Sequence, residues 1–202
     1  MRKVAKLLTD YVIKKSMVDE ADRAVYEYGF VITLEVGLFL VASLFIALKL
    51  DMVLEGIFFF VIFSPLRSYA GGLHLEKFWI CFVLSCLTYI TTLLVVKNLC
   101  LHEFVSLIVL FALEVFVYVL YPVENRNREI NEEENKCFNI KLMKYLCLDF
   151  FIGIVCTIFE KASYFLELNI IFLIVVITML IGKCRNHLKN VCKSYVPGKG
   201  LW

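Results

Sequence analysis

The stretch from residue 28 to residue 48 reads YGFVITLEVGLFLVASLFIAL, and Glu35 is its single charged residue. A helix needs about 20 mostly apolar residues to cross the hydrocarbon core of a bilayer, so this stretch predicts a membrane-spanning helix. Five further apolar stretches follow: residues 52–66, 78–96, 99–121, 145–159 and 165–182. The second and fifth of the six are short, so a tilted or partly re-entrant path is also open to them. The sequence therefore predicts an all-α, polytopic integral membrane protein with about six transmembrane or re-entrant helices.

The composition supports a membrane protein and excludes three other classes. Of the 202 residues, 61% are hydrophobic and 20% are charged, whereas a soluble domain has about 45–50% apolar and about 25% charged residues. A water-facing fold cannot hold this much Phe, Leu, Ile and Val without exposing large apolar patches. A soluble globular protein, a disordered chain and a nucleic-acid-binding protein with a basic face are therefore excluded, and no nucleic-acid partner is expected.

The basic residues predict the orientation in the membrane. If the N-terminus is cytoplasmic, 18 of the 21 Lys and Arg residues fall in the cytoplasmic parts, which are residues 1–27, 67–77, 122–144 and 183–202. The remaining three fall in short external loops: Lys49, Lys97 and Lys161. By the positive-inside rule, both termini are expected in the cytoplasm.

This topology divides the chain into a cytoplasmic N-terminal region at 1–27, a membrane domain at 28–182 and a basic cytoplasmic tail at 183–202. In the N-terminal region, apolar residues recur at helical spacing between basic ones: Val4, Leu7, Leu8, Tyr11 and Val12. The pattern predicts an amphipathic helix that lies on the anionic inner leaflet of the bilayer or packs on the protein itself. The polar loop at 122–144 is expected to be a solvated connection.

The stretch from residue 64 to residue 81 reads SPLRSYAGGLHLEKFWIC and joins the second and third apolar segments. Gly71 and Gly72 permit positive φ, so we expect a sharp turn there, within a catalytic loop over 64–81. His74 and Cys81 are the residue types of a base and a thiol nucleophile. A neighbouring imidazolium stabilises the reactive thiolate, and the same histidine can later protonate a leaving amine. The alternative is that both residues are structural.

The spacing of His74 and Cys81 sets a geometric condition. Residues i and i+7 of a straight helix lie about 10.5 Å apart at about 1.5 Å rise per residue, whereas hydrogen-bond reach is about 2.6–3.2 Å. A continuous helix over both residues therefore cannot form the pair. We expect the third helix to start near Leu75 or Glu76, so that the glycine turn folds the imidazole back onto Cys81. The alternative is that a second copy of the chain, in a homodimer, supplies one partner.

The pattern Arg67-x-x-x-Gly71-Gly72-x-His74, followed by Cys81, resembles that of the accessory gene regulator protein B (AgrB) family of membrane-embedded cysteine endopeptidases. The chain length, the six-segment hydropathy profile and the basic, amphipathic N-terminal region are also similar to this family. The resemblance implies that Cys81 is the nucleophile, that His74 is the base, and that Arg67 and Gly72 occupy positions needed for activity. It also implies a location in the bacterial cell membrane, with the active site near the cytoplasmic face.

The resemblance further implies a substrate and a reaction. The family cleaves a short precursor peptide of the AgrD type on the C-terminal side of the future signal, through an acyl-enzyme thioester. A Cys or Ser of the peptide then attacks the acyl group and closes a thiolactone or lactone ring, the precursor of a quorum-sensing signal. A site at the membrane interface suits this chemistry, because it limits water access while the peptide's own nucleophile stays close.

No cofactor and no metal is expected. None of the eight cysteines lies in a C-x-x-C pair, and no Cys/His cluster has zinc spacing. Most of the cysteines are expected to pack as small apolar residues with free thiols.

Further residues are candidates for positioning the substrate or stabilising the oxyanion. Arg67 fits an oxyanion or a substrate carboxylate, or alternatively a phospholipid anchor, and the N–H groups of Gly71 and Gly72 fit an oxyanion hole. A third residue that orients His74 is not evident, and four residues are candidates for this role: Ser68, Ser85, Glu76 and Glu35.

Carboxylates inside the apolar segments leave a second function open. Glu35, Glu114 and Asp149 are suspects for a functional role by their position in the membrane, or they pair structurally between helices. They suit a small transporter or permease in which His74 and Cys81 are incidental, and a non-catalytic membrane scaffold is a third possibility. The other two histidines are expected to be ordinary interface or surface residues: His102 and His187.

Overall fold

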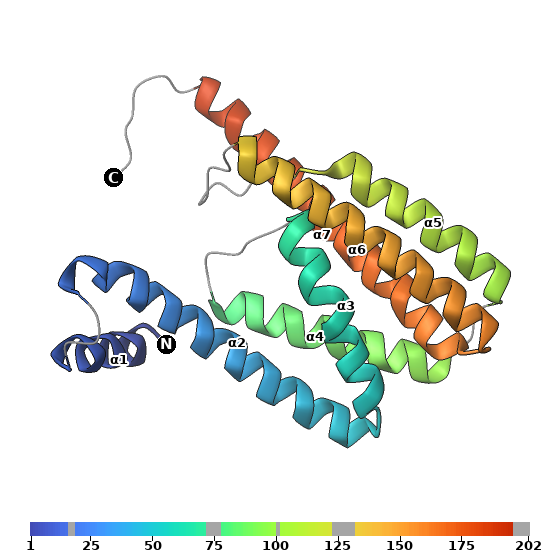
Figure 1. Cartoon of the computed structure of the whole chain (residues 1–202), viewed down its shortest axis with the longest axis horizontal. Coiled ribbons are helices and arrows are strands. Elements are labelled where there is room, and N and C mark those ends of the chain that lie inside the picture. Colours follow the sequence, from blue (N-terminus) through green and yellow to red (C-terminus); the bar gives the residue numbers. More distant parts are fainter. Residues whose placement is uncertain (16–18, 72–77, 100–101, 123–131, 196–202) are drawn as a thin grey trace. The chain divides into compact units, whose positions relative to one another are not determined.

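The structure is a computed structural model that describes residues 1–15, 19–71, 78–99, 102–122 and 132–195. Every secondary-structure element in these ranges is a helix, which confirms the predicted all-α class (Figure 1). In chain order the elements are α1 (Arg2–Lys14), the 3-10 helix η1 (Glu20–Asp22), α2 (Arg23–Leu50), α3 (Val53–Ala70), α4 (Phe78–Asn98), α5 (Glu103–Leu120), α6 (Glu132–Ile158) and α7 (Ala162–Tyr195).

Four stretches are long and apolar enough to cross a membrane: η1 with α2 over Glu20–Leu50, α3, α4, and α7 as far as Leu188. In α5 the apolar part is shorter, Phe104–Leu120, and α6 is not among the four. Each of the six predicted apolar segments overlaps one helix from α2 to α7. The helix at the second segment is longer than the predicted apolar stretch, and the helix at the fourth segment is shorter. The length of an apolar stretch therefore did not predict which helices are short.

The helix α3 continues past the predicted end of its apolar stretch. Pro65 lies inside this helix, which ends at Ala70, and residues 78–81 already belong to α4. Helix α3 therefore covers residues 64–70 of the predicted loop, whereas the start of α4 at Phe78 agrees with the predicted third apolar segment at 78–96. Burial of Ile62 and Leu66 on either side of the proline accounts for the continuation, because packing of this face offsets the roughly 3 kcal/mol that an interior proline costs a helix.

Two helices extend into parts predicted to be a polar connection and a tail. The first is α6, which begins at Glu132 and so includes the second half of the 122–144 loop, and the second is α7, which runs to Tyr195. Leu142 and Leu146 of α6 are buried, so this polar stretch does carry a packing face. Glu and Lys are good helix formers, and a high content of them predicts exposure to solvent but does not exclude a helix.

The described residues fall into two compact units. The first is made of Met1–Val53 and Leu75–Ile90, and the second of Leu54–His74 and Thr91–Trp202. Within the first unit, Phe39 of α2 and Tyr89 of α4 form an edge-to-face pair with ring centroids 6.5 Å apart.

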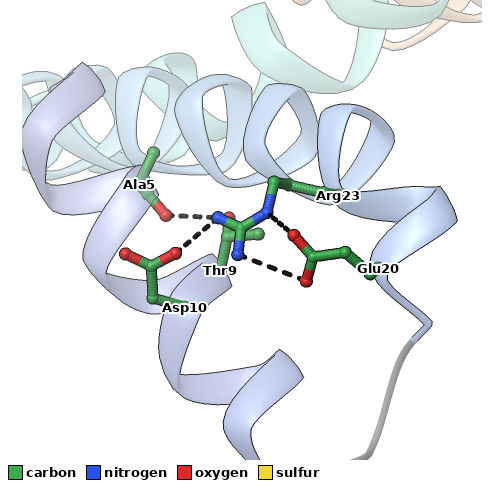
Figure 2. A network of polar contacts seen from close by, with 5 residues as sticks. All are labelled: Ala5, Thr9, Asp10, Glu20 and Arg23. Carbon is green, nitrogen blue, oxygen red and sulfur yellow. Dashed lines mark hydrogen bonds and ion pairs between the residues drawn. The ribbon is translucent and has the colours of Figure 1, made fainter.

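Also in the first unit, α1 packs along α2 (Figure 1). The contact face of α1 is small, since Ala5 and Thr9 are its fully buried residues. The guanidinium of Arg23, at the start of α2, pairs with the carboxylates of Asp10 in α1 and Glu20 in η1, as Figure 2 shows. One residue of α2 therefore ties the start of that helix to both preceding elements.

The apolar stripe of α1 is not the face that contacts α2. The Thr9 hydroxyl donates a 2.9 Å hydrogen bond to the Ala5 carbonyl, which satisfies the buried hydroxyl within the helix. Four stripe residues are 37–69% exposed: Val4, Leu7, Leu8 and Tyr11. Helix α1 thus packs on α2 through its small face and leaves its apolar stripe exposed, and the predicted contact of that stripe with the inner leaflet stays a prediction.

In the second unit, α5, α6 and α7 pack against one another (Figure 1). Of the four candidate spans, α7 has the largest buried share, 61% against 11–28% for the others. Gly153 of α6 marks the tightest approach, because a Cβ built there would lie 2.7 Å from Leu110 Cδ2 of α5 and 3.3 Å from the Phe165 ring of α7. Phe58 of α3 and Tyr164 of α7 form an edge-to-face pair at 5.2 Å.

Candidate functional site

The motif begins at the C-terminal end of α3, where Gly71 stops the helix. Gly71 has a φ of 78°, and its N–H donates a 3.2 Å hydrogen bond to the Arg67 carbonyl. A left-handed glycine after the last helical residue is a common helix stop, because glycine has no Cβ to clash in this conformation. The structure thus confirms the predicted turn at Gly71.

Arg67 is fixed by contacts on both sides of its guanidinium. Nη1 donates a 3.2 Å hydrogen bond to Thr178 Oγ1 of α7, and the guanidinium carbon lies 5.9 Å from the centroid of the Phe63 ring. The Thr178 hydroxyl in turn donates to the Val175 carbonyl at 2.9 Å, so its oxygen accepts from Arg67. The motif arginine is therefore attached to the most buried of the candidate spans.

Ser68 and Tyr69 complete the described end of α3. Ser68 is exposed, and its hydroxyl donates a 2.7 Å hydrogen bond to the Ser64 carbonyl one turn earlier. Tyr69 points toward α6, where its ring stacks on Tyr145 with centroids 5.4 Å apart.

The candidate nucleophile lies in the other unit. Cys81 is a half-buried free thiol near the described start of α4, and Ser85 follows one turn later and is also half-buried. The structure brings Arg67, Ser68 and Gly71 together at the end of α3. It brings Cys81 and Ser85 together on α4.

The remaining motif residues lie outside the described ranges. They are Gly72, His74 and Glu76, together with the predicted helix start near Leu75. The pairing of His74 with Cys81 and the fold-back that would bring them together therefore stay predictions.

Comparison with known proteins decides the family. The family model described as Accessory gene regulator B matches residues 5–182. The chain belongs to the accessory gene regulator B family.

Individual relatives of the AgrB family are more distant. AgrB-like protein 2 of Clostridium perfringens strain 13 is 24% identical over 140 residues, which is 66% of this chain and 65% of the relative. An AgrB-like protein of Clostridium perfringens strain SM101 is 25% identical over the same shares. The match thus covers slightly less than two thirds of the length of each curated relative, and no solved structure matches this chain.

This AgrB-family chain buries several acidic side chains in its second unit. Glu114 of α5, Asp149 of α6 and Glu167 of α7 are buried, and each has a side-chain oxygen without a hydrogen-bond partner among the described residues. Glu114 lies within electrostatic range of Asp149, and Glu167 within that of Glu55 in α3. Glu35, the third predicted intramembrane carboxylate, is half-buried on α2 in the first unit.

The two described histidines are placed at ordinary positions. His102 precedes α5, and its Nδ1 accepts a 3.4 Å hydrogen bond from the Phe104 N–H, as an N-cap does. His187 is exposed near the C-terminal end of α7.

Sequence reasoning missed two features of this region. Glu167 is fully buried, and both of its carboxylate oxygens lack a partner in the described part of the chain. The signal that could have found it is a carboxylate within an apolar stretch, which is the signal that identified Glu114. Tyr69 was missed because a single tyrosine next to a glycine turn carries no pattern of its own. Its partners on α6 lie about seventy residues away in the sequence, as Tyr145 shows.

Proposed function

We propose that this protein is a membrane-embedded cysteine endopeptidase that cleaves an AgrD-type precursor peptide and promotes its cyclisation to a thiolactone or lactone autoinducer. One observation carries the proposal: the family match over residues 5–182 includes the whole motif from Arg67 to Cys81. The half-buried free thiol of Cys81 is compatible with a nucleophile that the peptide can reach at the edge of the membrane.

In the first step, the Cys81 sulfur attacks the carbonyl carbon of the scissile peptide bond while His74 takes the thiol proton. The carbonyl oxygen becomes an oxyanion. Collapse of this intermediate breaks the C–N bond, and His74 delivers the proton to the leaving amine. The C-terminal fragment departs, and the N-terminal part remains bound to Cys81 as a thioester.

In the second step, a Cys thiol or Ser hydroxyl of the bound peptide attacks the thioester carbonyl. His74 accepts the proton of the attacking group and returns it to the Cys81 sulfur as the thioester bond breaks. The ring closes in preference to hydrolysis because the intramolecular nucleophile has a high effective concentration, provided that the site limits the access of water.

The other motif residues receive supporting roles in this proposal. Arg67, which Thr178 holds in place, binds the oxyanion or a carboxylate of the substrate. Gly71 shapes the turn, since its N–H already bonds the Arg67 carbonyl, and Gly72 supplies an N–H to the oxyanion. Ser68 and Ser85 position the substrate.

The location follows from the distribution of charge. Both termini lie in the cytoplasm of a bacterial cell, the chain crosses the cell membrane several times, and the active site lies near the cytoplasmic face. The asymmetry of Lys and Arg supports this orientation.

The decisive experiment is reconstitution of the purified protein in lipid vesicles with a candidate AgrD-type peptide. The wild type is expected to release the C-terminal fragment and to form a thioester on Cys81 that mass spectrometry detects, while Cys81→Ala and His74→Ala release none. Cys86→Ala is the matched control, because Cys86 is a half-buried free thiol on the same helix. Cleavage by Cys81→Ala would contradict the proposal.

Whether a homodimer is needed is tested by mixing variants. If a second copy supplies His74 to Cys81, mixed Cys81→Ala and His74→Ala proteins regain cleavage when co-reconstituted. If the pair forms within one chain by the fold-back, the mixture stays inactive.

The buried carboxyl groups favour a second candidate function. Glu114, Asp149 and Glu167 fit a small transporter or permease, because unpartnered carboxyl groups inside a membrane bundle are costly without a role. In that case Glu114→Gln or Asp149→Asn abolishes activity while Cys81→Ala keeps it. The cysteine endopeptidase predicts the opposite for Cys81→Ala.

A further inference from the structure

The helices α5, α6 and α7 of the second unit meet closely at Gly153 of α6. A Cβ built there would lie 2.7 Å from Leu110 Cδ2 of α5 and 3.3 Å from the Phe165 ring of α7. Beside this point, the Phe111 ring of α5 and the Phe150 ring of α6 form an edge-to-face pair with centroids 6.1 Å apart. These contacts fix the register of the three helices.

One helical turn from Gly153, the same register brings three polar residues to one level. Helix α6 runs antiparallel to α5 and α7 (Figure 1), so one turn forward along α5 and α7 corresponds to one turn back along α6. From the level of Gly153, this step leads to Glu114 of α5, Asp149 of α6 and Asn169 of α7. Asp149 lies within electrostatic range of Glu114, which agrees with this register.

The polar layer, which we define as Glu114, Asp149 and Asn169, is enclosed by apolar side chains. Each of its three residues is at most 9% exposed. The level of Gly153 covers one side of the layer. The other side, about one turn further along each helix, is occupied by apolar residues that are 0–5% exposed: Val117, Leu146 and Phe172.

The polar layer presents hydrogen-bond acceptors without a matching donor. Glu114 Oε1, Asp149 Oδ2 and Asn169 Oδ1 have no hydrogen-bond partner among the described residues. The NH2 group of Asn169 donates a 3.0 Å hydrogen bond to the Phe165 carbonyl. Because a carbonyl accepts only from the NH2 group, this bond fixes the orientation of the amide and leaves its oxygen for another partner.

No basic side chain of these helices lies at this level. Helix α5 contains no Lys or Arg, and the nearest basic residue of α6 to Asp149 in the sequence is Lys144, which is exposed. The basic residues of α7 begin at Lys183, more than three turns beyond Asn169. The two carboxyl groups are therefore not neutralised by a basic residue of their own helices.

The chemistry of the layer favours a small monovalent cation. Buried carboxylates are tolerated where they are paired or bind a metal ion, and oxygen ligands suit hard cations. Mg²⁺ usually keeps several of its waters, and Ca²⁺ takes about 6–8 oxygen ligands. Two carboxylates and one amide supply fewer oxygens than that, and the apolar enclosure does not suit a hydrated ion.

We propose that Glu114, Asp149 and Asn169 form a binding site for Na⁺ that joins α5, α6 and α7. With one of the two carboxyl groups protonated, the bound ion leaves the layer neutral. The amide oxygen of Asn169 is the ligand from the third helix. Because the ligands come from three helices, the ion binds the folded bundle and stabilises it. The proposal does not depend on the reaction at Cys81.

Thermal unfolding of the purified protein in detergent tests this site, with NaCl compared with choline chloride at equal ionic strength. A ligand that binds only the folded state raises the melting temperature by mass action. The wild type is expected to gain roughly 5–10 °C when Na⁺ is at about 100 times its dissociation constant. Choline is too large for the layer and is expected to give no gain. Retention of radioactive sodium by the protein measures binding directly.

Two variants each remove a ligand, and a third is the matched control. Asp149→Asn removes a charge, and Asn169→Leu removes the amide at similar volume. Glu167→Gln is the control, because Glu167 is also fully buried and lacks a hydrogen-bond partner among the described residues. It lies two residues before Asn169 and therefore on another face of α7, within electrostatic range of Glu55.

Asp149→Asn and Asn169→Leu are expected to lower the affinity for Na⁺ by at least about 30-fold, since a buried charge loses a partner in each case. Most of the Na⁺-dependent rise in melting temperature disappears with it. In choline chloride, Asp149→Asn is expected to be at least as stable as the wild type, because it removes one of two neighbouring carboxyl groups. A lost rise is thereby distinguished from a damaged fold. Glu167→Gln is expected to keep the rise and the bound sodium.

Equal melting temperatures of the wild type in NaCl and choline chloride, without bound sodium, overturn the proposal and leave protons to neutralise the carboxyl groups. A larger rise with Ca²⁺ than with Na⁺ also overturns it, and so does loss of the rise in Glu167→Gln. If Asp149→Asn does not fold, Glu114→Gln takes its place, and an unchanged rise there overturns the proposal. None of these measurements involves Cys81, so the proposed function is tested separately.

Discussion

Three glycines show how one residue type has different effects at different places. Gly71 has a φ of 78° at the end of α3. Gly153 of α6 faces Leu110 and Phe165 without room for a methyl group, and Gly37 of α2 has nothing within 4 Å of a built Cβ among the described residues. Substitution by alanine therefore meets backbone strain at the first, a steric clash at the second and open space at the third.

We expect Gly71→Ala to lower peptide cleavage with little change in thermal stability. An alanine in the left-handed region costs roughly 1–2 kcal/mol. A change in φ at residue 71 relieves this cost, and it also changes the direction in which the chain leaves α3. Gly71→Asn is the conservative comparison, because asparagine adopts this region more readily. Cleavage in vesicles and thermal unfolding in detergent measure the two effects, and equal cleavage by both variants at the wild-type rate would argue against a role for this turn.

Gly153→Ala is expected to destabilise the protein. The added methyl group would lie 2.7 Å from Leu110 Cδ2, and overpacking of a core typically costs about 1–3 kcal/mol. Gly37→Ala is the control and is expected to be neutral or stabilising by up to about 1 kcal/mol, since alanine is the better helix former. Melting temperatures of the two variants in one detergent test this contrast, and a lower value for Gly37→Ala than for Gly153→Ala would contradict it.

At the scale of elements, one face of α1 packs against the rest of the chain and a different, apolar face is exposed. Ala5 and Thr9 are fully buried against the rest of the chain, while Leu7 is 69% exposed. The ion pair between Arg23 and Asp10 joins the same two helices. Because exposed ion pairs contribute about 0–1 kcal/mol, we attribute the attachment of α1 mainly to the close packing of its small face.

Ala5→Leu is expected to detach α1 from α2, because a leucine side chain does not fit where an alanine methyl is fully buried. Hydrogen exchange of the α1 backbone, followed by mass spectrometry, is expected to become faster. Leu7→Ala is the control, since this exposed residue lies outside the contact face, and its exchange should match the wild type. Unchanged exchange in Ala5→Leu would show that α1 is held by other contacts.

At the scale of the whole molecule, charge and apolar length together predict the orientation in the membrane. The basic residues gather in the parts predicted to be cytoplasmic, while four helices have the length and composition of a membrane span. The polar first half of α6 is expected to lie outside the bilayer on the cytoplasmic side, and its apolar second half within it.

Two exposed cysteines of α6 test this arrangement. Cys137 lies in the polar half and Cys147 in the apolar half, and both are exposed in the structure. A membrane-impermeant thiol reagent is expected to label Cys137 in inverted membrane vesicles but not in intact cells, and to leave Cys147 unlabelled in both. Labelling of Cys137 from outside intact cells would reverse the proposed orientation.

The two units differ in how much of their packing was predictable. Apolar runs predicted α2 and α4 to within a few residues. The polar first half of α6 and the extension of α3 through Pro65 were not predicted, because each goes with burial of side chains that the local sequence does not reveal. The site shows the same division: the turn at Gly71 followed from glycine itself, whereas the contacts of Arg67 with Thr178 and of Tyr69 with Tyr145 did not.

The sequence alone determined that this protein is helical, that it belongs in a membrane and that Arg67 to Cys81 form one motif. Each of these properties is determined by a continuous stretch of sequence. The length of an apolar stretch is compared with the thickness of the bilayer, and the motif is a run of neighbouring residues. Only the tertiary structure decided that α1 packs through Ala5 and Thr9, that Glu167 is fully buried, and that α6 holds Tyr69. Contacts between helices join residues far apart in the chain. The spacing of apolar residues along one helix shows that it has a buried face, but it does not show which helix packs against that face.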